Sequence, residues 1–307
     1  MPSLYQRLVA DTLVPPGRRV HLARFDTTAT FEPELAALHG ATTKDRATEL
    51  VAENRAALAR AQELLWASDT YSVLVVLQGM DAAGKDGTIK HVMAGVNPAG
   101  CEVHRFATPT DEELDHSFLW RAWLKLPARG RIGIFNRSYY EDVLIVRVHR
   151  ELLAAQRLPP GAAGRDVWTE RFADINHFER HLVRNGTVVL KFFLNLSKAE
   201  QKRRLLERLD QPDKRWKFSA ADLEERGRWR EYMAAYQAML QATSTRWAPW
   251  YVIPADHKFV AHAVVATILT GRIAALGLDY PQVTVGERRR FAAARRRLLG
   301  GRSRAAR

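Results

Sequence analysis

From residue 72 onward, short apolar runs alternate with longer amphipathic stretches. The first run, Ser72–Leu77, is apolar almost throughout and ends at Gln78-Gly79. A continuous run of this length is typical of a strand that is buried on both faces of a sheet. Similar runs recur, so the pattern predicts five strands, at residues 72–77, 102–106, 131–135, 187–196 and 250–253.

The stretches between these runs have helical periodicity and helix-start signals. Thr110–Glu113 and Ser197–Glu200 both match the capping box, in which a Ser or Thr is followed three residues later by a Glu. Residues 168–184 place Phe172, Ile175 and Phe178 on one helical face. Strands that alternate with helices predict an α/β fold with a five-stranded parallel sheet covered by helices on both faces.

The same pattern divides the chain into three parts. Residues 1–70 read as a mostly helical N-terminal extension, with helical spacing of apolar residues from about 44 to 66. Residues 71–275 form one doubly wound domain, and residues 276–307 form a C-terminal tail. We find no internal repeat and no linker long enough to separate a second domain.

Composition narrows the class of protein. Of 307 residues, 47% are apolar and 26% are charged, which excludes a disordered or collagen-like chain. No apolar stretch approaches the roughly 20 residues of a membrane span, and the chain starts without the apolar core of a signal peptide. The single cysteine, Cys101, fits a reducing compartment, so we expect a cytoplasmic protein without membrane partners.

The net charge of +13 is concentrated at the C-terminus. Nine arginines and no acidic residue lie between Arg288 and Arg307, and without them 38 basic residues face 34 acidic ones, a net charge of only +4. The tail therefore says little about the domain itself. It is interpreted either as a solvated extension with weak nonspecific affinity for anions, or as a binding element for a polyanion.

The strongest motif follows the first predicted strand. Residues 79–88 read Gly-Met-Asp-Ala-Ala-Gly-Lys-Asp-Gly-Thr, which has the Gly-x4-Gly-Lys spacing of a phosphate loop between a strand and a helix. Glycines let backbone N–H groups converge on a phosphate, and the helix N-terminus adds its dipole. The motif predicts a phosphate site formed by Gly79, Ala82, Ala83, Gly84, Lys85, Asp86, Gly87 and Thr88.

Two acids make this loop unusual. Asp86 stands where a Ser or Thr commonly holds magnesium, and Asp81 lies inside the loop, where a carboxylate would repel a bound phosphate. A magnesium ion between the two would remove that repulsion, so Asp81 is the predicted metal ligand. The alternative is a chance glycine-rich turn in which the acids only begin a helix.

Polar residues also follow the third predicted strand. Asn136 and Arg137 come directly after Phe135, and Glu141 follows four residues later, at the sheet edge that faces the phosphate loop in a doubly wound fold. Arg137 can clamp phosphate oxygens, and Asn136 can bind metal weakly or through water. Glu141 has a competing structural interpretation, because Ser138-x-x-Glu141 is itself a capping box.

A basic segment follows the fourth predicted strand. Arg204 and Arg208 are four residues apart on one helical face, and Lys214 and Lys217 follow in a turn. Such a segment, at about residues 200–222, is placed to act as a lid that covers the phosphates. A solvated basic face is the alternative. Together with Lys90 and Arg121, the lid could line a groove for a long anion.

Several separated segments together resemble the second polyphosphate kinase family. They are residues 75–87, 135–143, 215–218 and 248–258, and the resemblance extends over about residues 25–275. It implies a thymidylate-kinase-like phosphate-loop fold, a need for Mg2+, and phosphoryl transfer between inorganic polyphosphate and a nucleotide. The Asp after the loop lysine also resembles that family.

The resemblance assigns roles to individual residues. Asp81 would hold magnesium, Lys85 and Arg137 would bind the transferred phosphate, and Arg204 would be the lid arginine. Some members of the family carry Asp at the position of Asn136. The ending Glu141-Asp142-Val143 resembles a subgroup that accepts AMP as well as ADP. The expected partners are thus inorganic polyphosphate and an adenine nucleotide, with no specific nucleic acid, in a homo-oligomer.

Two rival functions remain open. An ATP-dependent nucleotide kinase of thymidylate-kinase type would share the fold and the loop. A polyanion-binding protein would use the basic tail and carry a degenerate loop, which the intact Gly84-Lys85 pair argues against. Removal of the tail at about Gly286 separates the polyanion-binding protein from the two kinases. It should spare the activity of a kinase and abolish binding through the tail.

Overall fold

The structure is a computed structural model of the 307-residue chain, and it describes residues 3–31, 42–164 and 166–300. At its centre lies one sheet whose strands are β1 (Ser72–Gln78), β2 (Cys101–Arg105), β3 (Ile132–Asn136), β4 (Thr187–Asn195) and β5 (Trp250–Pro254). The strand order is β2-β3-β1-β4-β5, and every neighbouring pair is parallel. The five predicted strands are confirmed, with each boundary within one residue of its predicted place.

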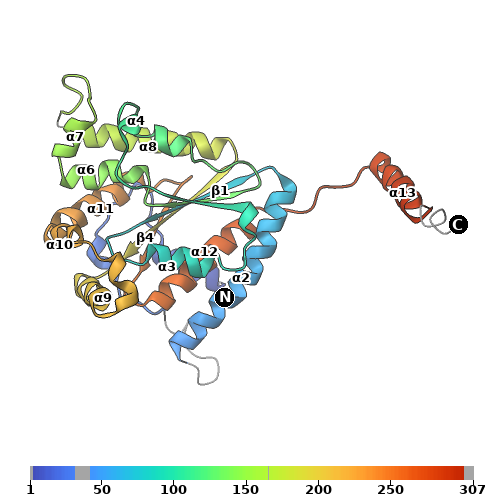
Figure 1. The fold of residues 1–307 in the computed structure, drawn as a ribbon, viewed down its shortest axis with the longest axis horizontal. Coiled ribbons are helices and arrows are strands. Elements are labelled where there is room, and N and C mark those ends of the chain that lie inside the picture. Colours follow the sequence, from blue (N-terminus) through green and yellow to red (C-terminus); the bar gives the residue numbers. More distant parts are fainter. Residues whose placement is uncertain (1–2, 32–41, 165, 301–307) are drawn as a thin grey trace.

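Helices occupy most of the chain between the strands (Figure 1). The long ones are α2 (Thr43–Ser68), α8 (Val167–Arg184), α9 (Lys198–Asp210), α11 (Trp229–Thr243), α12 (Lys258–Ala274) and α13 (Val285–Gly300). The shorter ones are α1 (Leu4–Thr12), α3 (Lys85–Val92), α4 (Asp111–Leu114), α5 (Trp120–Trp123), α6 (Ile145–Val148), α7 (Glu151–Ala155) and α10 (Ala221–Gly227). Turns of 3-10 helix form η1 (Leu22–Arg24), η2 (Pro98–Gly100), η3 (Tyr139–Val143) and η4 (Pro212–Lys217).

The central strand shows why its residues are apolar throughout. Val73 and Val75 belong to a core on one face of the sheet, which α2 and α12 cover, whereas Leu74 and Val76 belong to a core on the other face, beneath α8 and α11. Successive side chains of a strand point to opposite faces, so both faces need apolar residues. The predicted two-sided covering is confirmed, and Figure 1 shows helices on both sides of the sheet.

The N-terminal segment packs onto the sheet domain. Helix α1 packs against α12, and the Val14 N–H donates to the Trp250 carbonyl at 2.9 Å. Thr27 donates through its hydroxyl to the Asp256 carboxylate at 3.0 Å. Within the residues that the structure describes, no helix is both long and apolar enough to cross a membrane.

The predicted capping boxes have different outcomes. At α4 the box forms, because Thr110 and Glu113 exchange side-chain and backbone hydrogen bonds. At α9 only half of it forms: Ser197 accepts from the Glu200 N–H at 3.1 Å, but the Ser197 N–H donates to Asp256 at 2.8 Å instead. The predicted hydrogen bond from the Ser197 N–H to the Glu200 side chain was therefore wrong. The Glu200 carboxylate binds Arg203 and Arg204 instead.

Candidate active site

The glycine-rich loop connects the carboxyl end of β1 to the first turn of α3. A side chain at Gly79 would come within 3.0 Å of the Leu194 carbonyl on β4, so this position leaves no room for a Cβ. Gly84 adopts φ +104° at the helix N-cap, in the left-handed region that favours glycine. Thr88 lies buried in the first turn, where its N–H donates to the Gly84 carbonyl at 2.8 Å. The loop therefore wraps tightly around the start of α3.

Lys85 lies beneath this loop rather than in solvent. Its side chain is only 8% exposed, and its Nζ donates to the Gly79 carbonyl at 2.6 Å and to the Met80 carbonyl at 3.2 Å. Burial and then the nearby Arg137 charge lower the pKa of Lys85 to about 8. Carbonyls satisfy the donors of an ammonium group but do not neutralise its charge, so an anion entering the loop would stabilise it.

Arg137 joins the end of β3 to the loop. Its guanidinium forms an ion pair with the Asp81 carboxylate, and it lies 3.5 Å from Glu141. The neighbouring Glu141 and Asp81 carboxylates raise the pKa of Arg137 above its ordinary value. Glu141 does not form the alternative capping box, because Ser138 accepts from the Tyr140 N–H. Loop and strand end thus meet, as the sequence predicted.

The amide at the end of β3 has a different partner. Asn136 is buried, and its amide donates to the carboxylate of Asp86, which lies on the exposed side of the first turn of α3. Because this amide already binds a carboxylate, it ties α3 to β3. Gly87 follows on the same turn. A Cβ at this position would lie 3.8 Å from Nε2 of His262.

Arg204 on α9 is a support of the loop. It is buried, and its Nη1 donates at 3.0 Å to both the Ala82 and the Ala83 carbonyls. Its Nη2 donates to the Ala255 and Asp256 carbonyls. In this structure the guanidinium is thus held against the loop carbonyls, and the lid role expected for Arg204 stays a prediction.

The carboxylate of Glu200 completes the support. It accepts from Arg204 at 2.7 Å and from Arg203 at 2.6 Å, and the hydrogen bond from Arg203 in particular lowers the pKa of Glu200 to about 2. Gln201, the next residue, donates to the Asp81 carbonyl at 3.0 Å. No sequence signal marked Gln201, since a buried amide on a polar helix looks like any surface residue.

The predicted lid consists of the end of α9, η4 and α10. Arg208 bonds to the Asp222 carboxylate at 3.1 Å, Lys214 pairs with Glu207 at 2.7 Å, and Lys217 lies over the ring of Trp216, which is 78% exposed. Burial and the Asp81 charge raise the pKa of Asp222, and nearby cations, Arg208 first, oppose that shift. Sequence reasoning missed Asp222 as the partner of Arg208.

Two further predicted residues lie away from the loop. Lys90 is exposed on α3. Arg121 is buried on α5, where its Nη1 donates to the Ala107 carbonyl at 2.9 Å and lies 3.5 Å from Glu113. Their expected part in a polyanion groove with the lid stays a prediction.

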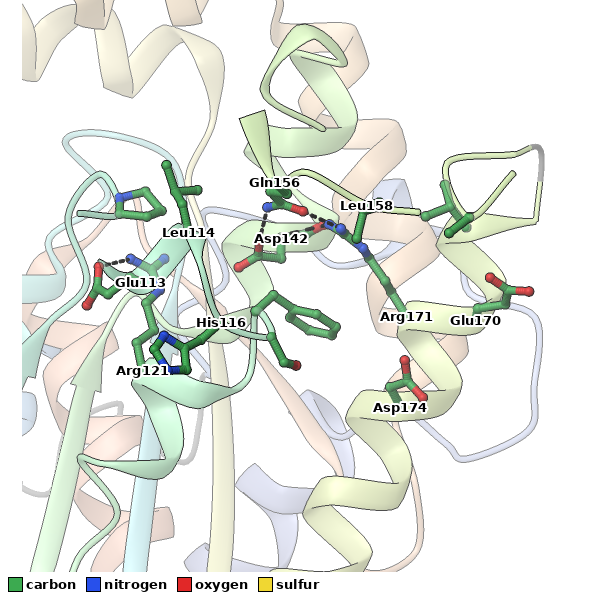
Figure 2. Close-up of a pocket in the computed structure, with 15 residues that line it drawn as sticks. Glu113, Leu114, His116, Arg121, Asp142, Gln156, Leu158, Glu170, Arg171 and Asp174 are labelled. Carbon is green, nitrogen blue, oxygen red and sulfur yellow. Dashed lines mark hydrogen bonds and ion pairs between the residues drawn. The ribbon is translucent and has the colours of Figure 1, made fainter. Parts of the chain in front are cut away.

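Arg121 lines a cavity of about 290 Å³ between α4, α5, η3 and α8 (Figure 2). In the cavity wall, Gln156 donates to the Asp142 carboxylate at 2.6 Å, and Arg171 donates to the Asp142 carbonyl at 2.8 Å. Burial raises the pKa of Asp142 to about 6, although Arg121 and Arg171 oppose that shift. Asp142 follows Glu141 directly, so η3 contributes to both the cavity and the Arg137 cluster.

The donor set at the loop fits a magnesium ion of the kind that phosphate substrates bring. Mg2+ in such sites takes one or two protein carboxylates, with phosphates and water completing its shell. Asp81 offers one partly exposed carboxylate beside the loop. Within the described residues, no three His, Cys, Asp or Glu side chains form a ready-made metal cage.

The fold and the site together define a class. A parallel sheet, a glycine-rich loop between β1 and α3, and a buried lysine under that loop define an α/β protein of the phosphate-loop kinase type. The model of the family described as polyphosphate kinase 2 matches residues 41–278. This match covers well over half of the chain, which therefore belongs to the polyphosphate kinase 2 family.

Individual relatives agree with this assignment. An ADP-polyphosphate phosphotransferase of Rhodopseudomonas palustris is 48% identical over 83% of this chain and 89% of its own length. An AMP/ADP-polyphosphate phosphotransferase of Meiothermus ruber is 46% identical over 88% of this chain and 94% of its own length. The crystal structure of polyphosphate kinase 2 from Arthrobacter aurescens TC1 superposes with a TM-score of 0.80 at 39% identity, covering 92% of this chain and 95% of that one.

Proposed function

We propose that this protein transfers a phosphoryl group from inorganic polyphosphate to AMP or ADP, in a reversible reaction that needs Mg2+. The observation that carries the proposal is the meeting of Asp81, Lys85 and Arg137 at one loop, at the carboxyl edge of adjacent strands. The printed names of the relatives supply the substrate classes.

The chain's own residues would act by positioning and by charge. Loop N–H groups and the Lys85 ammonium would hold the phosphoryl group, and Arg137 would neutralise charge that builds on its oxygens. Arg204 would keep the loop carbonyls in place and the N–H groups turned toward the substrate. Phosphoryl transfer of this kind requires no protein nucleophile, and we assign none.

Asp81 would hold the magnesium ion, which when bound would supply positive charge at the phosphates. The Asp81 carboxylate also pairs with Arg137, which keeps that guanidinium beside the loop for the phosphate oxygens. On the other side of the loop, Arg208, Lys214 and Lys217 would line the entry for a polyanion. Each of the first two is now balanced by an acid, Asp222 or Glu207.

The cavity beside α8 offers a place for the acceptor nucleoside. Asp142 of η3 lines it, and its wall combines arginine cations, carboxylates and the Gln156 amide (Figure 2). Polar groups that converge in a concave pocket are typical of ligand sites. We assign the base and ribose to this cavity, with Arg121 and Asp142 as their contacts and the acceptor phosphate toward Arg137.

The proposal is tested by supplying polyphosphate as the sole phosphoryl donor. Purified protein with Mg2+ is mixed with AMP, ADP or GDP, and the nucleotide products are separated by chromatography. We expect ADP from AMP and ATP from ADP, and loss of both on chelation of Mg2+ or in Asp81→Asn. Turnover with ATP as donor but none with polyphosphate would instead establish the ATP-dependent kinase.

A further inference from the structure

The C-terminal helix α13 stands apart from the domain. In Figure 1 it lies at the end of an extended segment, away from the sheet and its covering helices. Its start is fixed locally, because Thr284 and Glu287 exchange side-chain and backbone hydrogen bonds at the N-terminus. Its large apolar side chains are exposed, including Phe291 at 59% and Leu298 at 80%. Nothing in the domain therefore accounts for this helix.

The helix carries a dense and unneutralised positive charge. Its arginines form two triplets, Arg288–Arg290 and Arg295–Arg297, seven residues and thus nearly two turns apart, so they share one broad face. Within the described part of the chain, none of these six forms an ion pair, and the single acid of the helix, Glu287, is engaged in the cap. The sequence adds Arg302, Arg304 and Arg307 beyond the described residues.

The segment before the helix is anchored to the domain. Leu276 and Leu278 pack against the core, and the Tyr280 hydroxyl donates to Glu63 on α2 at 2.9 Å. Only residues 281–284 then lead to α13. The family model ends at residue 278, so the arginine helix is an addition to the part of the chain that defines the family.

We propose that α13 is a tether for long-chain inorganic polyphosphate, an inference that rests on the proposed function. The positive charge of the arginine face complements that of a polyanion. The proposed phosphoryl donor, polyphosphate, is the polyanion that reaches this protein during turnover. A helix that holds one part of a chain raises the effective concentration of its remainder at the loop. Repeated arginines with little aromatic surface suit a phosphate chain better than bases that need stacking partners.

The tether predicts a dependence on polymer length. A chain of hundreds of phosphates can contact the helix and the loop together, whereas tripolyphosphate is too short to span from α13 to the loop. The helix would then affect the KM for long polymers alone. Because arginine contacts to a polyanion release counterions, its contribution should also weaken with salt.

The test compares three full-length proteins that differ only at the six arginines of α13: the natural chain, a variant with all six changed to Gln, and a matched control with all six changed to Lys. We expect the Gln variant to raise the KM for long-chain polyphosphate about tenfold or more, with kcat and the KM for tripolyphosphate unchanged. The Lys variant should remain close to the natural chain, and added salt should reduce the difference.

Equal KM values for long polymer in the natural and Gln proteins would overturn the tether. So would direct binding measurements in which the six arginines matter for single-stranded RNA or for vesicles with anionic lipid but not for long polyphosphate. The binding measurement needs no nucleotide and no turnover. If none of the three proteins transfers phosphate but the Gln variant still loses affinity for the polymer, the proposed function fails and the tether stands.

Discussion

Two buried lysines in this protein have opposite surroundings. Lys191 on β4 is 0% exposed and donates to Glu179 at 2.6 Å, to the Thr243 carbonyl at 2.7 Å and to the Tyr140 hydroxyl at 2.9 Å. Lys85 is nearly as buried, but its two acceptors are backbone carbonyls of the loop. One ammonium group therefore has a carboxylate in direct contact, and the other has none.

The surroundings extend the contrast. Glu179 also accepts from the Tyr139 and Tyr140 hydroxyls, at 2.8 and 2.7 Å, so the Lys191 cluster is closed and satisfied. Around Lys85 the carboxylate of Asp81 and the guanidinium of Arg137 remain partly exposed, at 23% and 31%. A buried cation with a buried counter-charge belongs to the framework, whereas one with only carbonyl partners beside an opening is suited to receive an anion.

Lys85→Ala should have the largest effect on activity, and it tests the comparison of the two lysines directly. We expect kcat for ATP formation from polyphosphate and ADP to fall by about 10² to 10³ or more, because a preorganised cation next to the transferred group is lost. The midpoint of thermal unfolding should not fall, since the lysine has no side-chain ion pair to lose. An active Lys85→Ala protein would remove Lys85 from the proposed mechanism.

Lys191→Met should give the opposite result. It leaves Glu179 buried with no cation, which costs about 3–5 kcal/mol of unfolding free energy. The double variant Lys191→Met/Glu179→Gln should recover most of that loss, because no uncompensated charge remains. Urea denaturation followed by circular dichroism measures both, and a single variant as stable as the natural protein would contradict the closed-cluster interpretation.

The cavity beside α8 extends the comparison to a buried carboxylate, Asp142, which lines a cavity. Asp142→Asn should raise the KM for the nucleotide acceptor about tenfold, equivalent to a lost charge-assisted hydrogen bond of about 1.4 kcal/mol. The KM for polyphosphate should stay the same. If the two KM values rise together, the cavity does not bind the acceptor alone. Thermal unfolding of the variant controls for lost packing.

The smallest expected effect is on the pH profile. Since burial lowers the pKa of Lys85 to about 8, the protonated fraction in the free protein halves near that pH and falls further above it. The value of kcat/KM for polyphosphate should therefore decline on the alkaline side of pH 8, with the limb of kcat displaced to higher pH by the bound phosphate. A flat profile from pH 7 to 9.5 would show that the charge of Lys85 is not required.

Much of the framework could be predicted because its signals are local. Short, mostly apolar runs identified the strands, since a strand buried on both faces is predominantly apolar. The loop was recognised by its glycines and Lys85, whose spacing reflects the backbone path around a phosphate. Arg137 could be placed beside the loop from the rule that parallel strands end at one edge of a sheet.

Other features depended on contacts that spacing does not encode. Arg204 looked like a lid residue on a basic helix, yet packing of α9 against the loop buries it on four carbonyls. Glu141 matched a capping box, but its carboxylate lies beside Arg137. The carbonyl partners of Arg204 are far from it in the chain. Glu141 pairs with Arg137, four residues before it, because η3 turns that carboxylate back toward the end of β3.

The sequence by itself determined the strands, the phosphate loop and the charge of the tail, because periodicity, glycine spacing and composition act within a few residues. Only the tertiary structure decided which buried cations have a carboxylate in contact, as Lys191 does, and which have only carbonyl partners, as Lys85 does. The physical reason is that the state of a buried charge depends on the groups that packing brings around it, and those groups come from strands and helices distant in sequence.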